Sequence, residues 1–185
     1  GGGATPDSRG VPRPRLPVPP SYLTDKDKED LRFGIRHGVD FVAVSFVRSA
    51  SDIQEVRKFL VEEGANVPVV AKLERAEVVA NLGGILTLVD AVMVARGDLG
   101  VEVPIEEVPV IQKDVIRRAR LGKVPVIVAT HMLESMVHHV RPSRAEVSDV
   151  ATAVFDGADA GMLSAETATG RNPVQAVEVM ARVVE

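Results

Sequence analysis

The stretch DAVMVARGDLG, residues 90–100, joins five consecutive apolar residues to a polar turn that contains two glycines. A short apolar run rich in valine is typical of a strand that is buried on both faces of a parallel sheet. The glycines suit a tight turn directly after such a strand. We therefore predict a strand over Ala91–Ala95, with the side chains of Arg96 and Asp98 at its carboxyl end.

Runs of the same kind recur on both sides of this strand, with first residues 24 to 34 positions apart. The stretches between them are amphipathic, with apolar residues three and four positions apart. This alternation is typical of the α/β class, in which βα units build either a (β/α)₈ barrel of the TIM type or a doubly wound sheet. The predicted strands are Phe41–Val47, Val67–Leu73, Ala91–Ala95, Pro125–Ala129 and Asp159–Leu163.

Four of the intervening helices have recognisable first residues. We expect Thr24 and Ser51 to cap the helices that follow them, because their side chains can accept a hydrogen bond from a free amide of the first turn. Ser143 has a glutamate three residues later, which is the spacing of a capping box. The pair Asn172-Pro173 predicts the start of the last helix.

The composition fits a folded domain preceded by an extended segment. Of the 185 residues, 45% are hydrophobic and 26% are charged, which excludes a disordered or collagen-like chain. Six of the 12 prolines lie within the first twenty positions. We expect residues 1–20 to be a linker, or an arm that docks on a partner through its polyproline shape, and residues 21–185 to fold as one domain.

Charge and cysteine content exclude several kinds of function. With no cysteine, the chain has no disulfide, thiolate metal site or cysteine nucleophile. A formal net charge of −4 gives no long-range attraction for nucleic acid or for an anionic membrane. No apolar run approaches the roughly 20 residues that cross a bilayer. We expect a cytoplasmic protein with neither nucleic acid nor a membrane as its partner.

Polar side chains follow every predicted strand, at the ends that parallel strands bring to one rim of the sheet. Ligands of α/β proteins bind at this rim, so the position of these residues predicts a cleft that they share. They are Ser45, Lys72 and Glu74, Arg96 and Asp98, Thr130, and Ser164 with Glu166.

Lys72, Glu74 and Asp98 suggest metal-assisted chemistry. Lys72 and Glu74 are two residues apart, so on a strand they face the same way, and Asp98 follows the neighbouring strand. Two carboxylates completed by water and substrate oxygens suit Mg²⁺ in phosphate chemistry. Lys72 would neutralise charge on a transferring phosphoryl group or an enolate. An ordinary salt bridge between Lys72 and Glu74 is the alternative.

Other residues of the rim leave two interpretations open. Gly97 and Gly100 either let backbone amides approach an anion or only make the turn into a helix, and Thr130 either donates to a ligand or caps a helix. The histidines match no strong zinc motif and are expected at the surface: they are His131, His138 and His139. Methionines 93, 132, 136 and 162 are expected in the core.

Six blocks of this sequence closely resemble the pyruvate kinase family, in order, from about Leu23 to the end. The blocks are LTDKDKEDLRFGIRHGVDFVAVSFVRS, VVAKLER, DAVMVARGDLGVEVP, VPVIVATHMLESM, RPSRAEVSDVATAVFDGADAGMLSAET and RNPVQAVEVM. The resemblance implies a (β/α)₈ barrel that binds Mg²⁺ or Mn²⁺ together with K⁺. It also implies transfer of the phosphoryl group of phosphoenolpyruvate to ADP, which gives pyruvate and ATP in glycolysis.

The resemblance also implies roles for individual residues. Lys72 is similar to the lysine that stabilises phosphoryl transfer and the enolate, and Glu74 and Asp98 are similar to the two protein ligands of Mg²⁺. The backbone amides of Gly97 and Asp98 would hold the substrate carboxylate. The remaining roles fall on Thr130, which would bind substrate and help to protonate the enolate, on Ser164, as a member of that proton relay, and on Ser45, near the phosphate.

A complete barrel needs eight βα units and about 250 residues. This sequence resembles only the fourth to eighth units, preceded by the third helix, so we expect a partial barrel of about five parallel βα units. The family's K⁺ ligands lie outside it, and its open edges should seek a second copy or a complementing barrel fragment. The alternatives are a Mg²⁺-dependent lyase or aldolase acting on pyruvate-like enolates, and a catalytically incomplete fragment that acts as an association module.

Overall fold

The structure, a computed structural model, describes residues 21–185. The segment expected to be a linker, residues 1–20, lies outside them. Five parallel strands form one sheet in the order β1-β2-β3-β4-β5. The strands are β1 (Val42–Val44), β2 (Val69–Leu73), β3 (Ala91–Ala95), β4 (Val126–Ala129) and β5 (Ala160–Met162).

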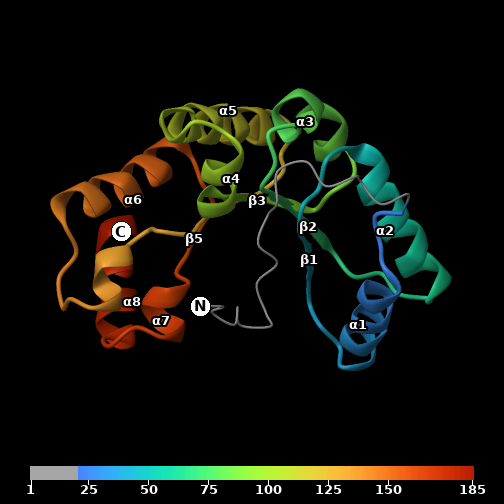
Figure 1. The fold of residues 1–185 in the computed structure, drawn as a ribbon, viewed down its shortest axis with the longest axis horizontal. Coiled ribbons are helices and arrows are strands. Elements are labelled where there is room, and N and C mark those ends of the chain that lie inside the picture. Colours follow the sequence, from blue (N-terminus) through green and yellow to red (C-terminus); the bar gives the residue numbers. More distant parts are fainter. Residues whose placement is uncertain (1–20) are drawn as a thin grey trace, which may run out of the picture.

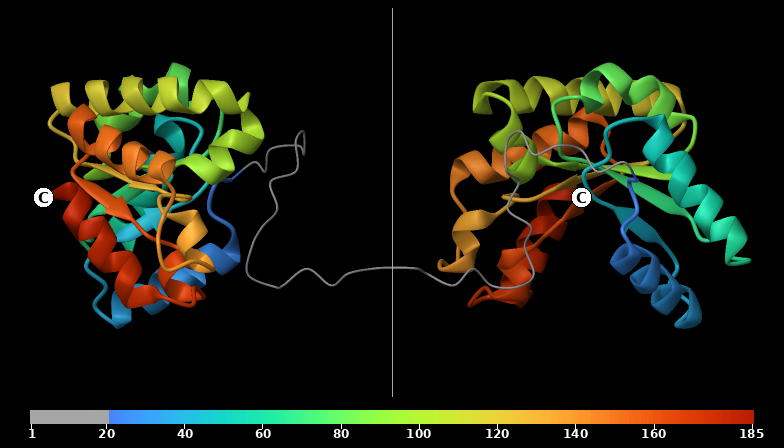
Figure 2. Two further views of the ribbon diagram at one scale, coloured as in Figure 1. Left: turned by 90° about the vertical axis from the view of Figure 1, so that its left-hand side faces the viewer. Right: turned by 45° about the vertical axis from the view of Figure 1, so that its right-hand side comes forward.

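Helices connect the strands and surround the sheet in an arc (Figures 1 and 2). The α-helices are α1 (Asp25–Arg36), α2 (Ala50–Glu62), α3 (Val78–Leu86), α4 (Arg96–Glu102), α5 (Val108–Leu121), α6 (Arg144–Asp156), α7 (Ala165–Ala168) and α8 (Pro173–Val184). Two short 3₁₀ helices are η1 (Ile105–Glu107) and η2 (Glu134–Val137). None of the helices in residues 21–185 has the length and apolar character needed to cross a bilayer.

The strand order follows the chain without reversal, which decides between the two α/β architectures. A doubly wound sheet reverses its order at a switch point, and ligands bind there. In this sheet each strand pairs with the next strand along the chain, as in a barrel wall. The expectation of a partial barrel of five βα units is therefore confirmed.

The two faces of the sheet belong to different hydrophobic clusters, and successive residues of a strand point alternately to one face and the other. In β3, Val92 and Val94 belong to the large core between sheet and helices, while Met93 belongs to a small cluster on the opposite face. In β2, Val70 joins this small cluster. Lys72 lies two residues further along β2, so its side chain is on the same face of the sheet as Val70, which we call the inner face.

Four of the five strands are shorter than predicted, whereas β3 has the predicted limits. The strand β1 ends at Val44, and the left-handed backbone of Phe46, with φ of 57°, prevents its continuation to Val47. Proline has no N–H to donate to the sheet, so β4 begins after Pro125. Asp98 follows β3, as expected, but it lies in the first turn of α4 and not in a separate turn before the helix.

In β2 and β4, the amide of the first residue donates to an aspartate that directly precedes the next strand along the chain. The Asp90 carboxylate accepts from the Val69 amide at 2.7 Å, and the Asp159 carboxylate accepts from the Val126 amide at 2.8 Å. In each pair a second bond returns from the aspartate amide to the carbonyl of the same strand residue. These paired bonds set the register of neighbouring strands at the end of the sheet opposite the predicted cleft.

The predicted helix starts are confirmed at three of four places. Thr24 caps α1, Ser143 caps α6, and α8 begins with Pro173 after Asn172. The expectation for Ser51 is wrong, because α2 starts earlier, after Ser49. Ser49 is the N-cap residue, but its side chain makes no capping hydrogen bond; the hydroxyl groups of Ser49 and Ser51 bond to each other at 2.8 Å.

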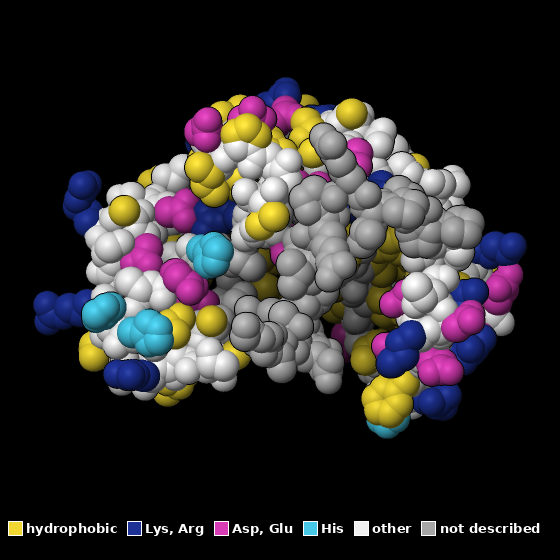
Figure 3. Space-filling model, viewed as in Figure 1, with side chains coloured by type: hydrophobic (Ala, Val, Ile, Leu, Met, Phe, Trp, Pro, Cys, Tyr) yellow, Lys and Arg dark blue, Asp and Glu magenta, His cyan; other side chains and the backbone are white. Residues whose placement is uncertain are grey.

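Side chains of both charge signs lie side by side over α1 (right-hand side of Figure 3).

The three methionines Met93, Met132 and Met136 are buried, as expected, and Met162 packs against the small inner cluster.

The capping box of α6 contains a carboxylate that accepts three hydrogen bonds. Glu146 accepts from the amide and hydroxyl of Ser135, both at 2.6 Å, and from the Ser143 amide at 2.6 Å. Its own amide donates to the Ser143 hydroxyl at 3.2 Å. Burial alone would raise the pKa of Glu146, but the bonds from Ser135 and Ser143 outweigh it and hold the pKa below its usual value.

Replacement of Glu146 by glutamine should remove part of the acid sensitivity of folding. Because the folded-state pKa of Glu146 is lowered, its carboxylate stabilises the fold above its ordinary pKa of about 4.3 and loses this effect as the pH falls through the lowered value. We expect Glu146→Gln to lose about 1 kcal/mol of unfolding free energy at pH 7 and clearly less at pH 3. Urea unfolding measures both, with Glu106→Gln as an exposed control; equal losses at the two pH values would contradict the prediction.

Candidate active site

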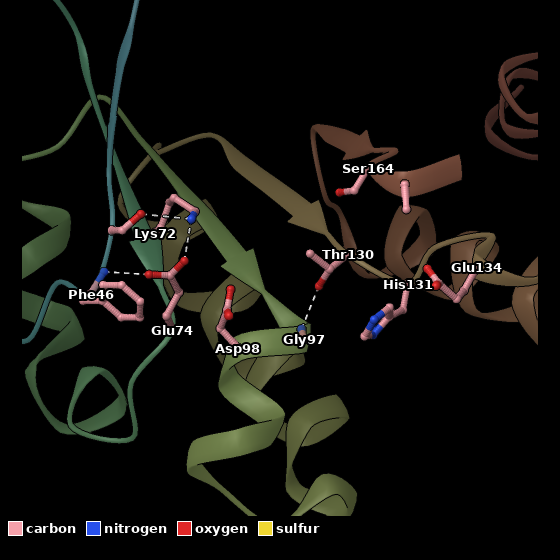
Figure 4. A pocket seen from close by; sticks show the side chains of 11 residues that line it. Phe46, Lys72, Glu74, Gly97, Asp98, Thr130, His131, Glu134 and Ser164 are labelled. Atoms are coloured by element: carbon pink, nitrogen blue, oxygen red, sulfur yellow. Dashed lines mark hydrogen bonds and ion pairs between the residues drawn. The ribbon is translucent and has the colours of Figure 1, made fainter. Parts of the chain in front are cut away.

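A cavity of about 540 Å³ lies at the carboxyl ends of the strands (Figure 4). Seven predicted site residues line it, and each strand-to-helix connection contributes at least one lining residue; Arg96 and Glu166, also expected at the cleft, do not line it. The lining residues are Ser45, Phe46, Lys72, Glu74, Gly97, Asp98, Thr130, His131, Glu134, Ser164 and Ala165. The parallel sheet thus brings together most of the residues that the sequence placed at one rim.

Lys72 and Glu74 form an ion pair at the end of β2. The distance between Lys72 Nζ and Glu74 Oε1 is 2.5 Å, and Lys72 Nζ also donates to Ser45 Oγ at 3.0 Å. The second carboxylate oxygen, Glu74 Oε2, accepts from the Phe46 amide at 2.6 Å. The connection after β1 therefore holds both charged groups of β2.

The Glu74 carboxylate is 1% exposed, although it carries a charge. Burial raises the pKa of Glu74, and the negative charge of Asp98 raises it further. The bonds from Lys72 and Phe46 oppose this rise without cancelling it. A cation placed between Glu74 and Asp98 would relieve both unfavourable effects, so the electrostatics of this corner favour a positively charged ligand.

Asp98 supplies the second carboxylate. It is half-buried at the first turn of α4 and points into the cavity beside Glu74 (Figure 4). Within residues 21–185 no hydrogen bond or ion pair engages its side chain, so both oxygens face the cavity without a protein donor. No group of three or more His, Asp or Glu side chains in this part of the chain has the geometry of a metal site.

The residues present fit a hard divalent cation bound through few protein ligands. Two carboxylates from neighbouring βα connections leave most of an octahedron to water and substrate oxygens, which is how Mg²⁺ is bound in phosphate chemistry. Glu74 and Asp98 are the side chains that would hold it.

Thr130 contacts the neighbouring connection instead of capping its own. Its hydroxyl accepts from the Gly97 amide at 2.7 Å and donates to the Ala129 carbonyl at 2.7 Å. A side chain at position 97 would crowd it, since an added Cβ would lie 3.2 Å from Thr130 Oγ1. A glycine at position 97 permits this close approach, and in this structure its amide donates to Thr130.

The backbone of Thr130 and His131 is held in an uncommon conformation. Both residues have a left-handed backbone, with φ of 68° and 54°. Arg96 donates to the Thr130 carbonyl at 2.9 Å and to the His131 carbonyl at 3.1 Å, and it pairs with Asp149 of α6 at 2.6 Å. Arg96 therefore supports the cavity wall without lining the cavity.

Ser164 lies on the far side of the cavity, where a buried carboxylate fixes it. Glu166 is fully buried and accepts from the Ser164 amide at 2.8 Å and from the Leu133 amide at 3.1 Å. The two connections that follow β4 and β5 are thus joined through one side chain. Glu166 serves as a support, whereas Ser164 faces the cavity.

Sequence reasoning missed four lining residues, namely Phe46, His131, Glu134 and Ala165. His131 is exposed, as expected, but it is exposed to the cavity, whereas His138 and His139 are exposed elsewhere. The left-handed backbones of Phe46 and His131 turn these residues toward the cavity, and neither sequence position carries a glycine or asparagine that would have signalled such a turn.

The description "Pyruvate kinase, barrel domain" belongs to a family model that matches residues 2–177. The chain belongs to the pyruvate kinase family. Among its relatives, the pyruvate kinase of Corynebacterium efficiens is 54% identical over 183 residues, which cover 99% of this chain and 39% of the relative. The pyruvate kinase of Mycobacterium tuberculosis is 53% identical with the same coverage.

A cyanobacterial relative, pyruvate kinase 2 of Synechocystis, is 52% identical over 184 residues, which cover 100% of this chain and 31% of the relative. The chain therefore spans about two fifths, or less, of the length of these pyruvate kinases. The family match confirms the expected barrel class, and membership in this family implies a metal cofactor.

Loss of Lys72 should destabilise the fold more than loss of the carboxylate it pairs with. Lys72→Met leaves the buried Glu74 without its cation, which we expect to cost about 3 kcal/mol of unfolding free energy at pH 7. Glu74→Gln keeps an acceptor for the Phe46 amide and should cost about 1 kcal/mol. The double variant should be more stable than Lys72→Met alone.

The loss in Lys72→Met should also depend on pH. Because burial raises the pKa of Glu74 and the Lys72 ammonium opposes the rise, removal of Lys72 lets the carboxyl take a proton more readily. A carboxyl with a raised pKa destabilises the fold as the pH rises through that value, so the loss should shrink toward pH 4. Urea unfolding in the presence of a metal chelator checks this; a loss of unfolding free energy that does not vary with pH would refute it.

Proposed function

We propose that this chain carries the metal-binding and enolate-binding part of a pyruvate kinase active site. The reaction is transfer of the phosphoryl group of phosphoenolpyruvate to ADP, which gives ATP and pyruvate. The observation that supports the proposal best is the arrangement of one ammonium and two carboxylates around a single cavity, with a threonine hydroxyl on its opposite side. Family membership supports the same reaction.

Lys72 and the two carboxylates would act on the phosphoryl group. The bond between the enol oxygen and phosphorus breaks as a bond to an oxygen of ADP forms, and negative charge appears on the enolate. The Lys72 ammonium is held by Ser45 and Glu74, so it would meet this charge without rearrangement. Mg²⁺ or Mn²⁺, held by Glu74 and Asp98, would supply further positive charge at the phosphoryl and enolate oxygens.

Thr130 and Ser164 would serve the second half of the reaction. The enolate must take a proton on its methylene carbon to become pyruvate. The Thr130 hydroxyl faces the cavity and is oriented by the Gly97 amide and the Ala129 carbonyl, and Ser164 faces the same space. We assign Thr130 to substrate binding and proton delivery, with Ser164 in the same relay.

Further assignments follow the family. Ser45 would lie near the phosphate, and the amides of Gly97 and Asp98 would face the substrate carboxylate, although in this structure Thr130 engages the Gly97 amide. K⁺ would be bound by residues outside this chain. Self-association, or pairing with the rest of a barrel, would cover the edge strands β1 and β5, and the location would be the cytoplasm.

Binding of Mn²⁺ should depend on both carboxylates. We expect Glu74→Gln and Asp98→Asn each to raise the Mn²⁺ dissociation constant at least tenfold, because each removes one of two charged ligands. The control Glu106→Gln changes an exposed carboxylate outside the cavity and should leave the constant unchanged. Electron paramagnetic resonance of free Mn²⁺ gives the constants. Equal affinities in all four proteins would contradict the assignment of the metal ligands.

The reaction is tested by pyruvate release from phosphoenolpyruvate in the presence of Mg²⁺ and K⁺, with and without ADP. Release that requires ADP and falls at least a hundredfold in Lys72→Met supports the proposed kinase. Release without ADP would support the lyase instead. No release at any protein concentration, from a chain that self-associates without binding Mn²⁺, would support an association module.

A further inference from the structure

Tyr22 lies near the start of the described chain and contacts Ser45, which lines the candidate active site. Its hydroxyl donates a hydrogen bond to the carbonyl of Ser45, in the connection after β1. The ring is half-buried, and the Arg48 guanidinium lies 6.0 Å from its centroid. Arg48 is itself fixed by two bonds to the buried Asp52, at 2.6 and 3.0 Å.

The backbone on both sides of Tyr22 is tied to α2. Glu55 accepts from the Ser21 hydroxyl at 2.5 Å, from the Tyr22 amide at 3.0 Å and from the Leu23 amide at 3.0 Å. Leu23 is buried in the core. The bonds to Glu55 and the burial of Leu23 therefore fix the backbone of Tyr22, from which its hydroxyl reaches Ser45.

The segment that Tyr22 contacts holds the charged pair of the site. Ser45 Oγ accepts from Lys72 Nζ at 3.0 Å, and the Phe46 amide donates to Glu74 Oε2 at 2.6 Å. Phe46 has a left-handed backbone, with φ of 57°, which is unfavourable for a bulky residue. Such a conformation persists only where neighbouring bonds impose it.

We propose that Tyr22 is a positioning residue whose hydroxyl fixes the Ser45 carbonyl, and so keeps Ser45 and Phe46 in contact with Lys72 and Glu74. Ser45 and Phe46 are adjacent, so a bond to the carbonyl of Ser45 restrains the peptide unit that carries the Phe46 amide. The inference rests on the proposed function only in the roles given there to Lys72 and Glu74.

The surroundings of Tyr22 favour the protonated form of its hydroxyl. Burial raises the pKa of Tyr22, and the negative charges of Asp52 and Glu74 raise it further. The protonated hydroxyl is the form that donates to the Ser45 carbonyl. Loss of the hydroxyl, and not its titration, is the way to test its role.

The experiment compares two variants of the whole chain that each lose one hydroxyl-to-carbonyl bond. Tyr22→Phe removes the bond to Ser45 and keeps the ring. Thr87→Val removes the bond from Thr87 Oγ1 to the Gly84 carbonyl, which is 2.8 Å long and lies at the end of α3, outside the cavity. The measurements are the hydrogen-exchange rate of the Phe46 amide by NMR and the Mn²⁺ dissociation constant.

We expect Tyr22→Phe to speed exchange at the Phe46 amide by about fivefold, the worth of one net hydrogen bond, and to raise the Mn²⁺ dissociation constant severalfold. Thr87→Val should change neither quantity. Exchange at Phe46 that is the same in Tyr22→Phe as in the parent chain overturns the proposal, as does an equal change in both variants.

The two proposals fail in different ways. If the parent chain binds no Mn²⁺, the proposed function is wrong, but the exchange rate at Phe46 still decides whether Tyr22 positions the segment. If Mn²⁺ binds and Tyr22→Phe alters neither exchange nor affinity, the proposed function stands and the role of Tyr22 is refuted.

Discussion

A buried negative charge at the rim of the sheet is the constraint on which the site depends. The Glu74 carboxylate is almost without solvent, and it is kept there by the Lys72 ammonium on one oxygen and the Phe46 amide on the other. A buried carboxylate without such partners would be strongly unfavourable. The left-handed turn at Phe46 is thus linked to the charge, because it aims the amide at Glu74. The nearby charge of Asp98 leaves the corner short of positive charge, which is the condition for binding a cation.

The sheet makes this arrangement possible by bringing successive connections to one rim. The strand order equals the chain order, so each connection has as its neighbour the connection of the next βα unit. The structure uses this adjacency repeatedly: Lys72 bonds to Ser45, Thr130 accepts from Gly97, and Glu166 accepts from Leu133. At the opposite end of the sheet, Asp90 and Asp159 join neighbouring strands in the same way. Hydrogen bonds between neighbours along the sheet therefore fix the cavity wall.

Much of this could be predicted from the sequence, because apolar period and strand-end polarity are local signals. The limits of β3 and the caps at Thr24 and Ser143 follow from such signals, and the rim residues converge because parallel strands require it. What could not be predicted depends on tertiary contacts. Ser51 has the residue type of a cap, but the helix starts earlier. Thr130 has the position of a cap, yet a glycine from another unit is close enough to use its hydroxyl. The backbone of Phe46 depends on a bond to Glu74, 28 residues away.

The contribution of Tyr22 belongs to the same class of unpredictable features, and it extends the chain of bonds beyond the rim. From Glu55 of α2 the bonds run to the backbone of Tyr22, then to the Ser45 carbonyl, and through Ser45 and Phe46 to Lys72 and Glu74. Each step joins groups that differ in sequence position by more than twenty residues, except the step within the Ser45–Phe46 peptide. A helix on the outside of the barrel wall thereby has a direct physical connection to the charges at its centre. Removal of the Tyr22 hydroxyl interrupts this path without altering the charges of Lys72 and Glu74. The effect of geometry at this site can therefore be measured separately from the effect of charge.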